Sequence, residues 1–276
     1  MQHLVRMLIQ LTAAIPGAPL SAGELPEARV GTEWRLEENA TTFMARELLI
    51  ADDRVAVWYC RVCDFDAGVL ALPETLGLMS NDELVRYRQF HFEHDRQLFV
   101  ATRVLLRCVL SRFGTAAPRE WRFARNAYGR PAIASPSAVQ GLHFNLSHTR
   151  DLVVCAVSAC KTIGVDAEWV APVRPTAVIV PWALSSQEAL FMATLPPAAQ
   201  RIAFYRFWTL KEAYVKARGM GLSLPLSDVM FDIRDKHRID VAFKGKITDC
   251  AMHWRFRQFS VFGRYIVAIA GRSPPL

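Results

Sequence analysis

The sequence predicts an α+β fold made of two similar lobes, each a small, mostly antiparallel sheet packed with helices. The chain has 276 residues, of which 52% are hydrophobic, enough for one large domain or two modest ones. Short runs of β-forming residues alternate with amphipathic helical segments. No fixed-period repeat is present, yet helices and strands recur in a similar order in each half. This recurrence favours two related lobes.

The pattern also predicts the domain boundaries. Residues 1–50 mix a short helical pattern with several Pro and Gly residues, and we expect them to form a peripheral extension of unknown role. We expect residues 51–157 to form the N-terminal lobe and residues 158–276 the C-terminal lobe.

Each predicted lobe has recognisable helix and strand signals. In the first, Ser80 and Glu83 have the spacing of a capping box and predict a helix starting near Asn81. A longer helix is expected from Glu93 to Phe113. Strands are predicted at residues 55–62, 121–124, 142–148 and 152–157, with a turn at 126–131.

In the second lobe, Ser185 and Glu188 form another capping-box pattern, and this helix should end before Pro196. A helix from Phe204 should end at the glycines 219 and 221. Strands are predicted at residues 162–169, 229–233, 241–243, 252–256 and 265–269.

Charge and cysteine content restrict the classes of partner and compartment. The formal net charge of +7 suits a partner with phosphates or acidic side chains, so nucleic acid, a nucleotide-like cofactor and an acidic protein all remain open. Cys60 and Cys63 have redox or zinc spacing, but no second pair stands nearby, which favours core cysteines in a reducing compartment. No apolar run is long enough to span a bilayer, and the N-terminal apolar run is interrupted by Arg6. We therefore expect a cytoplasmic protein without membrane partners.

Two carboxylates lie on one predicted strand and a third lies on a predicted helix. Asp166 and Glu168 share a strand face with Gly164, which indicates either a cation site or a solvent-facing edge strand. Glu212 and Lys216 stand at i and i+4 on the helix. Taken alone, they could form a surface pair worth roughly 0.2–0.5 kcal/mol.

Together these residues are typical of phosphoryl-transfer chemistry. Three carboxylates suit Mg²⁺, which takes oxygen ligands and completes its shell with substrate phosphates. Lys211 and Lys216 stand where they could hold the same phosphates. No Walker loop or kinase glycine loop is present, which argues against ATP hydrolysis.

Five motifs, in order along the chain, resemble the 4′-phosphopantetheinyl transferases. They are Tyr128-Gly-Arg-Pro131, Phe144-Asn-Leu-Ser-His148, Gly164-Val-Asp-Ala-Glu168, Trp208-Thr-Leu-Lys-Glu-Ala-Tyr-Val-Lys216 and Gly219-Met-Gly-Leu-Ser-Leu-Pro225. The resemblance covers about residues 55 to 270. It is to the surfactin-synthetase-activating type, a single-chain pseudo-dimer, and it implies a monomer.

The resemblance implies transfer of phosphopantetheine from coenzyme A to a serine of an acyl, peptidyl or aryl carrier protein, with release of adenosine 3′,5′-bisphosphate. The basic charge of the chain fits the acidic helix typical of such carriers. The apolar residues 172–182, with Phe191, are a candidate docking site. A buried core segment is an equal alternative for those residues.

The resemblance assigns a role to each matching residue. Asp166, Glu168 and Glu212 would hold Mg²⁺, with Mn²⁺ as an alternative ion, and Lys216 would contact the pyrophosphate. The coenzyme A contacts would also include Lys211, Arg86, Arg88, Arg130, Ser147 and His148.

Two positions keep a second interpretation. Glu188 matches a carboxylate proposed as general base, but its place in the capping box offers a structural alternative of equal weight. Glu83 stands where the family can have a lysine, which leaves His148 as the main candidate for the 3′-phosphate of coenzyme A.

The clustered carboxylates and basic charge also fit a Mg²⁺-dependent nuclease or a nucleic-acid-binding protein. Such nucleases usually carry a Glu-x-Lys pair on a strand, whereas Lys211 and Glu212 lie on a predicted helix. The chain has no interleaved aromatic and basic surface suited to stacked bases. We therefore expect no nucleic-acid partner.

Overall fold

The computed structural model describes residues 33–36, 43–50, 53–65, 68–136, 141–170, 176–221, 224–235 and 238–272. These residues belong to two compact units. The first contains the described parts of Met1–Leu48, Arg54–Arg125 and Pro131–Lys161. The second contains those of Leu49–Asp53, Asn126–Arg130 and Thr162–Leu276. The predicted α+β class is confirmed, with small antiparallel sheets and packed helices in both units.

The first unit is built on a five-stranded sheet of order β1-β2-β3-β7-β6. Its strands are β1 (Glu33–Leu36), β2 (Phe43–Ile50), β3 (Asp53–Arg61), β6 (His143–Thr149) and β7 (Leu152–Ser158). The segment expected to be a peripheral extension thus supplies two strands, β1 and β2, to this sheet. Strand β7 lies inside the sheet, between β3 and β6, and every one of its residues is buried. Its sequence is accordingly an almost continuous apolar run.

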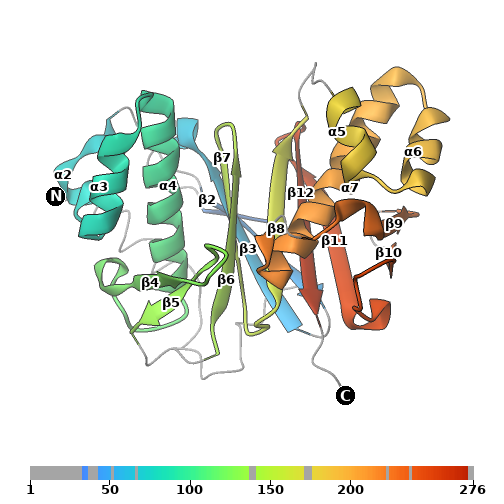
Figure 1. Cartoon of the computed structure of the whole chain (residues 1–276). Coiled ribbons are helices and arrows are strands. Elements are labelled where there is room, and N and C mark those ends of the chain that lie inside the picture. Colours follow the sequence, from blue (N-terminus) through green and yellow to red (C-terminus); the bar gives the residue numbers. More distant parts are fainter. Residues whose placement is uncertain are drawn as a thin grey trace. The chain divides into compact units, whose positions relative to one another are not determined.

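Helix α4 (Glu93–Leu110) packs on the sheet of the first unit, beside α3 (Asn81–Gln89) and α2 (Pro73–Leu76) (Figure 1). The predicted capping box is present: the backbone N–H of Ser80 donates to Glu83 Oε2 at 2.9 Å, and the Glu83 N–H donates to Ser80 Oγ at 3.4 Å. The unit also contains the pair β4 (Arg122–Arg125) and β5 (Pro131–Ser135) and the short 3₁₀ helices η1 (Val62–Asp64), η2 (Val69–Ala71) and η3 (Pro118–Glu120).

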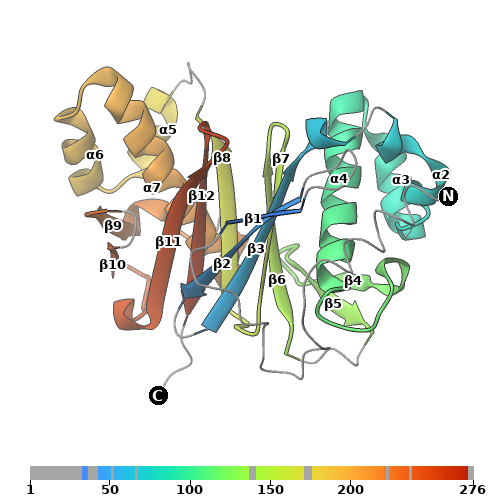
Figure 2. The same ribbon diagram turned by 180° about the vertical axis from the view of Figure 1, so that it is seen from behind.

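The second unit has a three-stranded antiparallel sheet of order β11-β12-β8 and a two-stranded pair, β9 and β10. Their bounds are β8 (Ile163–Trp169), β9 (Val229–Ile233), β10 (Ile239–Phe243), β11 (Trp254–Val261) and β12 (Tyr265–Arg272). The helices are α5 (Thr176–Ala183), α6 (Ser186–Ala193) and α7 (Pro197–Arg218), with 3₁₀ helices η5 (Leu226–Asp228) and η6 (Ala251–His253). Seen from behind, the three strands lie in front of α7 (Figure 2).

Helix α7 is longer at its start than the sequence predicted. It begins at Pro197, where the missing N–H costs no intrahelical bond, rather than near Phe204. It ends as expected: Gly219 adopts a left-handed conformation with φ 63°, and its N–H donates to the carbonyls of Val215 and Lys216. The predicted apolar stripe, including Phe204, Leu210 and Tyr214, is buried.

Gly164 allows α7 to lie directly against β8. A Cβ at this position would stand 2.0 Å from the carbonyl oxygen of Ala213 and 2.5 Å from the backbone nitrogen of Ala217. Any side chain here would therefore push the helix away from the strand. Although β8 is at the edge of its sheet, Gly164 faces a helix and Asp166 is buried, which excludes a solvent-facing strand.

Candidate metal and phosphate site

Asp166 and Lys216 form the centre of the candidate site in the second unit. Asp166 lies on β8 and only 5% of it is exposed, while Lys216 lies on the last turns of α7. The ammonium Nζ of Lys216 is 2.6 Å from Asp166 Oδ1. A buried carboxylate is costly without a cation, so Lys216 provides the charge that Asp166 requires here.

Glu168, two residues along β8, is held by α7 through Trp208. The indole Nε1 of Trp208 donates to Glu168 Oε1 over 3.1 Å. The Trp208 ring in turn packs edge-on against Trp182, with ring centroids 5.7 Å apart. Trp208 stands in the predicted motif but was not assigned a role from the sequence. Its hydrogen bond fixes the orientation of one of the three carboxylates.

Glu212 lies one helical turn before Lys216 and is electrostatically coupled to the other carboxylates. Burial raises the pKa of Glu212 to about 7, and repulsion from Asp166 and Glu168 adds to the increase, while Lys216 opposes it. Its Oε1 atom is buried and has no hydrogen-bond partner within the described part of the chain. Such an oxygen calls for a cation or a proton.

The donor set fits a hard divalent cation in type and charge. Asp166, Glu168 and Glu212 are coupled carboxylates, and Mg²⁺ prefers oxygen ligands. The described residues contain no His, Cys, Asp or Glu cluster already gathered into a three-ligand cage. Lys216 pairs with one of these carboxylates, Asp166.

Lys211 and Glu188 form a separate, buried ion pair. Lys211 Nζ is 2.7 Å from Glu188 Oε2 and donates to the carbonyls of Leu226 at 2.8 Å and Val229 at 2.5 Å. Successive helix residues point about 100° apart, so Lys211 and Glu212 project from α7 in different directions. The predicted phosphate contact by Lys211 is therefore disfavoured, because its ammonium is enclosed by protein groups.

The Glu188 carboxylate is equally engaged. Its Oε2 accepts from the Ser185 N–H at 2.7 Å and its Oε1 accepts from the Phe231 N–H at 2.9 Å, in addition to the Lys211 ion pair. Only 2% of the residue is exposed. Of the two interpretations kept from the sequence, this geometry favours the helix cap over the general base.

Arg130 contacts the backbone of the second unit. Its Nη1 donates to the carbonyl of Ala217 at 2.7 Å and its Nη2 to that of Ile163 at 2.8 Å. The guanidinium therefore joins the end of α7 to the start of β8, a function that the sequence pattern did not indicate.

The other predicted coenzyme A residues lie in the first unit. Arg86 and Arg88 are exposed on α3. Ser147 and His148 are neighbours on β6, where Ser147 is buried and His148 is exposed, as expected for side chains on opposite strand faces.

Glu83 has a structural partner set that the sequence did not reveal. Its carboxylate lies 2.6 Å from Arg107 Nη2 and 3.3 Å from Arg103 Nε, and Arg107 is fully buried. The Arg103 guanidinium also stacks over the ring of Phe99. Arg103 and Arg107 of α4 therefore neutralise the Glu83 carboxylate of α3.

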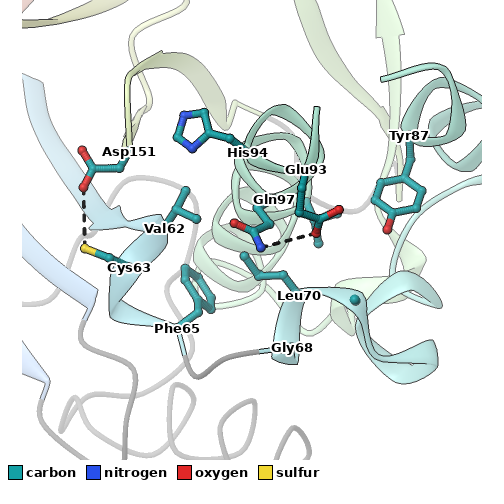
Figure 3. A pocket seen from close by; sticks show the side chains of 12 residues that line it. Val62, Cys63, Phe65, Gly68, Leu70, Tyr87, Glu93, His94, Gln97 and Asp151 are labelled. Atoms are coloured by element: carbon teal, nitrogen blue, oxygen red, sulfur yellow. Dashed lines mark hydrogen bonds between the residues drawn. The ribbon is translucent and has the colours of Figure 1, made fainter. Parts of the chain in front are cut away.

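The first unit contains a cavity of about 350 Å³ between η1, η2 and the start of α4. Its apolar lining includes Val62 and Leu70, and Cys63 donates to Asp151 at its rim (Figure 3). None of the predicted site residues lines this cavity. It also lies in a different unit from the coupled carboxylates.

The expectation of core cysteines holds for Cys60 and is wrong for Cys63. Cys60, Cys108, Cys155 and Cys160 are buried, whereas Cys63 is exposed, so the two members of the Cys-x-x-Cys sequence differ in environment. Among the described residues, no helix has the length and apolar character required to cross a bilayer.

Comparison with known proteins identifies the family. A family profile described as "4'-phosphopantetheinyl transferase superfamily" matches residues 162–270, and one described as "4'-phosphopantetheinyl transferase, N-terminal" matches residues 71–160.

The chain is 32% identical to the 4'-phosphopantetheinyl transferase HetI of Nostoc sp. over 64% of this chain and 73% of that protein. It is 26% identical to the 4'-phosphopantetheinyl transferase Sfp of Bacillus subtilis, covering 72% of this chain and 84% of that protein. A phosphopantetheinyl transferase of Thraustochytrium sp. is 30% identical over 67% of this chain and 68% of that protein. The chain therefore belongs to the 4′-phosphopantetheinyl transferase superfamily, and to its Sfp-like type.

Proposed function

We propose that this protein transfers the 4′-phosphopantetheine arm of coenzyme A to a serine of a carrier protein, converting the apo-carrier to the holo-carrier. Membership of the transferase superfamily supports this activity. At the level of individual residues, the activity is supported by the electrostatic coupling of Asp166, Glu168 and Glu212. Lys216 lies beside Asp166.

In this reaction the serine oxygen forms a bond to the β-phosphorus of coenzyme A. The phosphoanhydride bond to the adenosine side breaks, and adenosine 3′,5′-bisphosphate leaves. The serine proton is lost to a base. Because the Glu188 carboxylate already accepts two backbone hydrogen bonds and pairs with Lys211, we assign it to the fold rather than to this proton transfer.

Asp166, Glu168 and Glu212 would hold Mg²⁺ or Mn²⁺, and Trp208 would keep Glu168 oriented toward it. When bound, the ion would neutralise charge on the pyrophosphate of coenzyme A and make adenosine 3′,5′-bisphosphate a better leaving group. Lys216 pairs with Asp166 of this group, and we assign its ammonium to the charge that develops on the phosphate oxygens.

Ser147, His148, Arg86 and Arg88 are proposed to bind the 3′-phosphate side of coenzyme A. His148 and both arginines are exposed and can reach a ligand, and Glu83 is neutralised by Arg103 and Arg107. Arg86 and Arg88 therefore still give α3 a basic face, although Glu83 stands where the family can have a lysine.

A carrier protein is proposed to dock on the apolar surface of α5, α6 and α7. The exposed side chains there are Trp182, Leu190, Phe191 and Ile202. Large apolar side chains left exposed on neighbouring helices are typical of protein-binding surfaces. Residues 172–175 of the expected docking segment lie outside the described residues.

We further propose a monomer that acts in the cytoplasm, with lobes divided near residues 50 and 157, and without nucleic-acid partners. The relatives reported above are all named as transferases, so they give no support to the nuclease alternative.

The test is an intact-mass assay with the full chain, coenzyme A, Mg²⁺ and purified apo-carriers of the acyl, peptidyl and aryl types. We expect at least one carrier to gain the mass of one phosphopantetheine arm, and we expect EDTA and Asp166→Asn to prevent the gain. Failure to modify any of the three carrier types would refute the proposal.

A further inference from the structure

We infer that Asn126 and Arg130 are positioning residues that hold α7 and β8 in the relative placement required by the carboxylate group. The inference rests on the proposed function. It gives these residues a role that acts through the backbone, in place of the contact with coenzyme A implied for Arg130 by resemblance.

The turn that carries both side chains is itself firmly hydrogen-bonded. Asn126 Oδ1 accepts from the N–H groups of Tyr128 and Arg130, each at 2.9 Å. The Asn126 N–H donates to the Arg130 carbonyl at 3.0 Å. An Asn that caps its own turn in this way fixes the backbone from which both side chains project.

Both side chains bind the end of α7. Asn126 Nδ2 donates to the carbonyl of Gly219 at 3.1 Å, and Arg130 Nη1 donates to that of Ala217 at 2.7 Å. The last carbonyls of a helix have no partner within it, and they carry the negative end of its dipole. An amide donor and a guanidinium therefore satisfy both the hydrogen bonds and the charge of this terminus.

Arg130 also reaches the strand. Its Nη2 donates to the carbonyl of Ile163 at 2.8 Å, so one planar group spans the helix end and the first residue of β8. The guanidinium fork is rigid and presents these donors in a fixed relation. The fit is close: a Cβ at Gly219 would be 3.1 Å from Arg130 Cδ.

These contacts lie next to the site in the chain. Ile163 is three residues before Asp166, and Ala217 directly follows Lys216. Between them lies the contact of Gly164 with the backbone of Ala213 and Ala217. A slip of β8 against α7 would change the 2.6 Å separation of Lys216 and Asp166. Catalytic groups need placement to within about 0.5 Å, so this fastening matters for the chemistry.

The experiment compares Arg130→Met, Arg130→Lys and Asn126→Ala with the wild type. Arg255→Met is the matched control, because Arg255 Nη1 also donates to two carbonyls, those of Met252 and Trp254, but only locally. Calorimetry measures Mg²⁺ affinity without coenzyme A, and coenzyme A affinity without Mg²⁺. The transferase assay gives the Mg²⁺ concentration for half-maximal rate.

We expect Arg130→Met to weaken Mg²⁺ binding about tenfold or more, the usual cost of losing a supporting contact behind a metal ligand. Coenzyme A affinity without Mg²⁺ should change less than twofold. Arg130→Lys should restore part of the Mg²⁺ affinity, Asn126→Ala should move it in the same direction to a smaller extent, and Arg255→Met should leave it unchanged.

Three results would overturn the inference. Weaker coenzyme A binding with normal Mg²⁺ affinity would make Arg130 a ligand contact, and a lower Tm with normal Mg²⁺ affinity would make it a purely structural residue. The third result applies if Arg130→Met does not fold. Unchanged Mg²⁺ affinity in both Asn126→Ala and Arg130→Lys would then overturn the inference. An inactive wild type that does not bind Mg²⁺ would instead refute the proposed function, and this inference with it.

Discussion

The charge of Glu212 is unfavourable for the fold, and we propose the same residue as a metal ligand. Its carboxylate is buried near Asp166 and Glu168, and its pKa is raised from 4.5 to about 7. Burial and like charges both disfavour the ionised form, which is the form that a metal ion requires. The metal-free protein therefore carries a charge conflict that a divalent cation would relieve.

Replacing Glu212 by Gln should remove that conflict. The free energy of unfolding should then increase, and the size of the increase should depend on pH. Between pH 4.5 and about 7 the folded protein binds the Glu212 proton more tightly than the unfolded chain, so this residue lowers stability as pH rises, with the full effect above 7. At pH 8.5 in EDTA, Glu212→Gln should gain on the order of 2–3 kcal/mol relative to the wild type. At pH 4 the gain should nearly vanish.

Denaturant unfolding at the two pH values measures this difference, with the exposed Glu74→Gln as the control. The same variant should lose transferase activity while staying folded. An equal difference at both pH values would show that the pKa of Glu212 is the same in the folded and unfolded states, and that its carboxylate meets no conflict in the folded state.

At the scale of the elements, the buried pair Glu188–Lys211 joins three segments of the second unit. Glu188 lies in the first turn of α6, and Lys211 lies in α7. Both side chains also form hydrogen bonds with backbone groups of residues 226–231, around the start of β9. Breaking a buried pair leaves an uncompensated charge, which typically costs about 3–5 kcal/mol.

We therefore expect Glu188→Gln to lower the free energy of unfolding by about 3 kcal/mol or more, with a similar effect for Lys211→Met. The double variant should be less destabilised than the sum of the two single variants, because it leaves no unpaired charge. Denaturation of the four proteins measures the coupling. At a temperature where it is folded, Glu188→Gln should retain kcat within a few-fold. A folded variant with wild-type stability and no activity would instead identify Glu188 as the general base.

Local patterns predicted the helices and strands well because capping and periodicity are properties of neighbouring residues. The capping boxes at Ser80 and Ser185, the glycine end of α7 and the Asp166 strand are all present as predicted. The sequence pattern did not predict the start of α7 at Pro197, because a proline can either end a helix or occupy its first position.

The tertiary partners could not be predicted in the same way. The carbonyls that Arg130 binds lie 33 and 87 residues away along the chain. Lys211 and Glu212 are consecutive on a helix, so their side chains project about 100° apart, and this spacing alone disfavours a shared ligand. The burial of Arg107 against Glu83 had no sequence signal beyond the presence of a charged pair.

At the scale of the whole molecule, the two family matches and the two compact units divide the chain at nearly the same place. The matches cover residues 71–160 and 162–270. The main segments of the two units meet between Lys161 and Thr162, and residues 49–53 and 126–130 also belong to the second unit. The candidate metal ligands all belong to the second unit, while Arg86, Arg88, Ser147 and His148 belong to the first. The roles proposed above are thus assigned to residues of both units.

The net charge of +7 is a property of the entire chain and should act on the approach of an acidic carrier protein. Attraction between exposed charges speeds association and is screened as salt shortens the Debye length, from about 10 Å at 0.1 M to about 3 Å at 1 M. We expect kcat/KM for the apo-carrier to fall several-fold over this range. The kcat at saturating carrier should change much less, because groups buried within the site are screened weakly.

Initial rates measured at fixed free Mg²⁺ and saturating coenzyme A test this prediction, with a carrier variant whose acidic helix has been neutralised as the control. The salt dependence should be smaller for that variant. If both carriers respond equally to salt, the long-range charge is not what brings the partners together, and the exposed apolar side chains of α5, α6 and α7 must supply most of the docking energy.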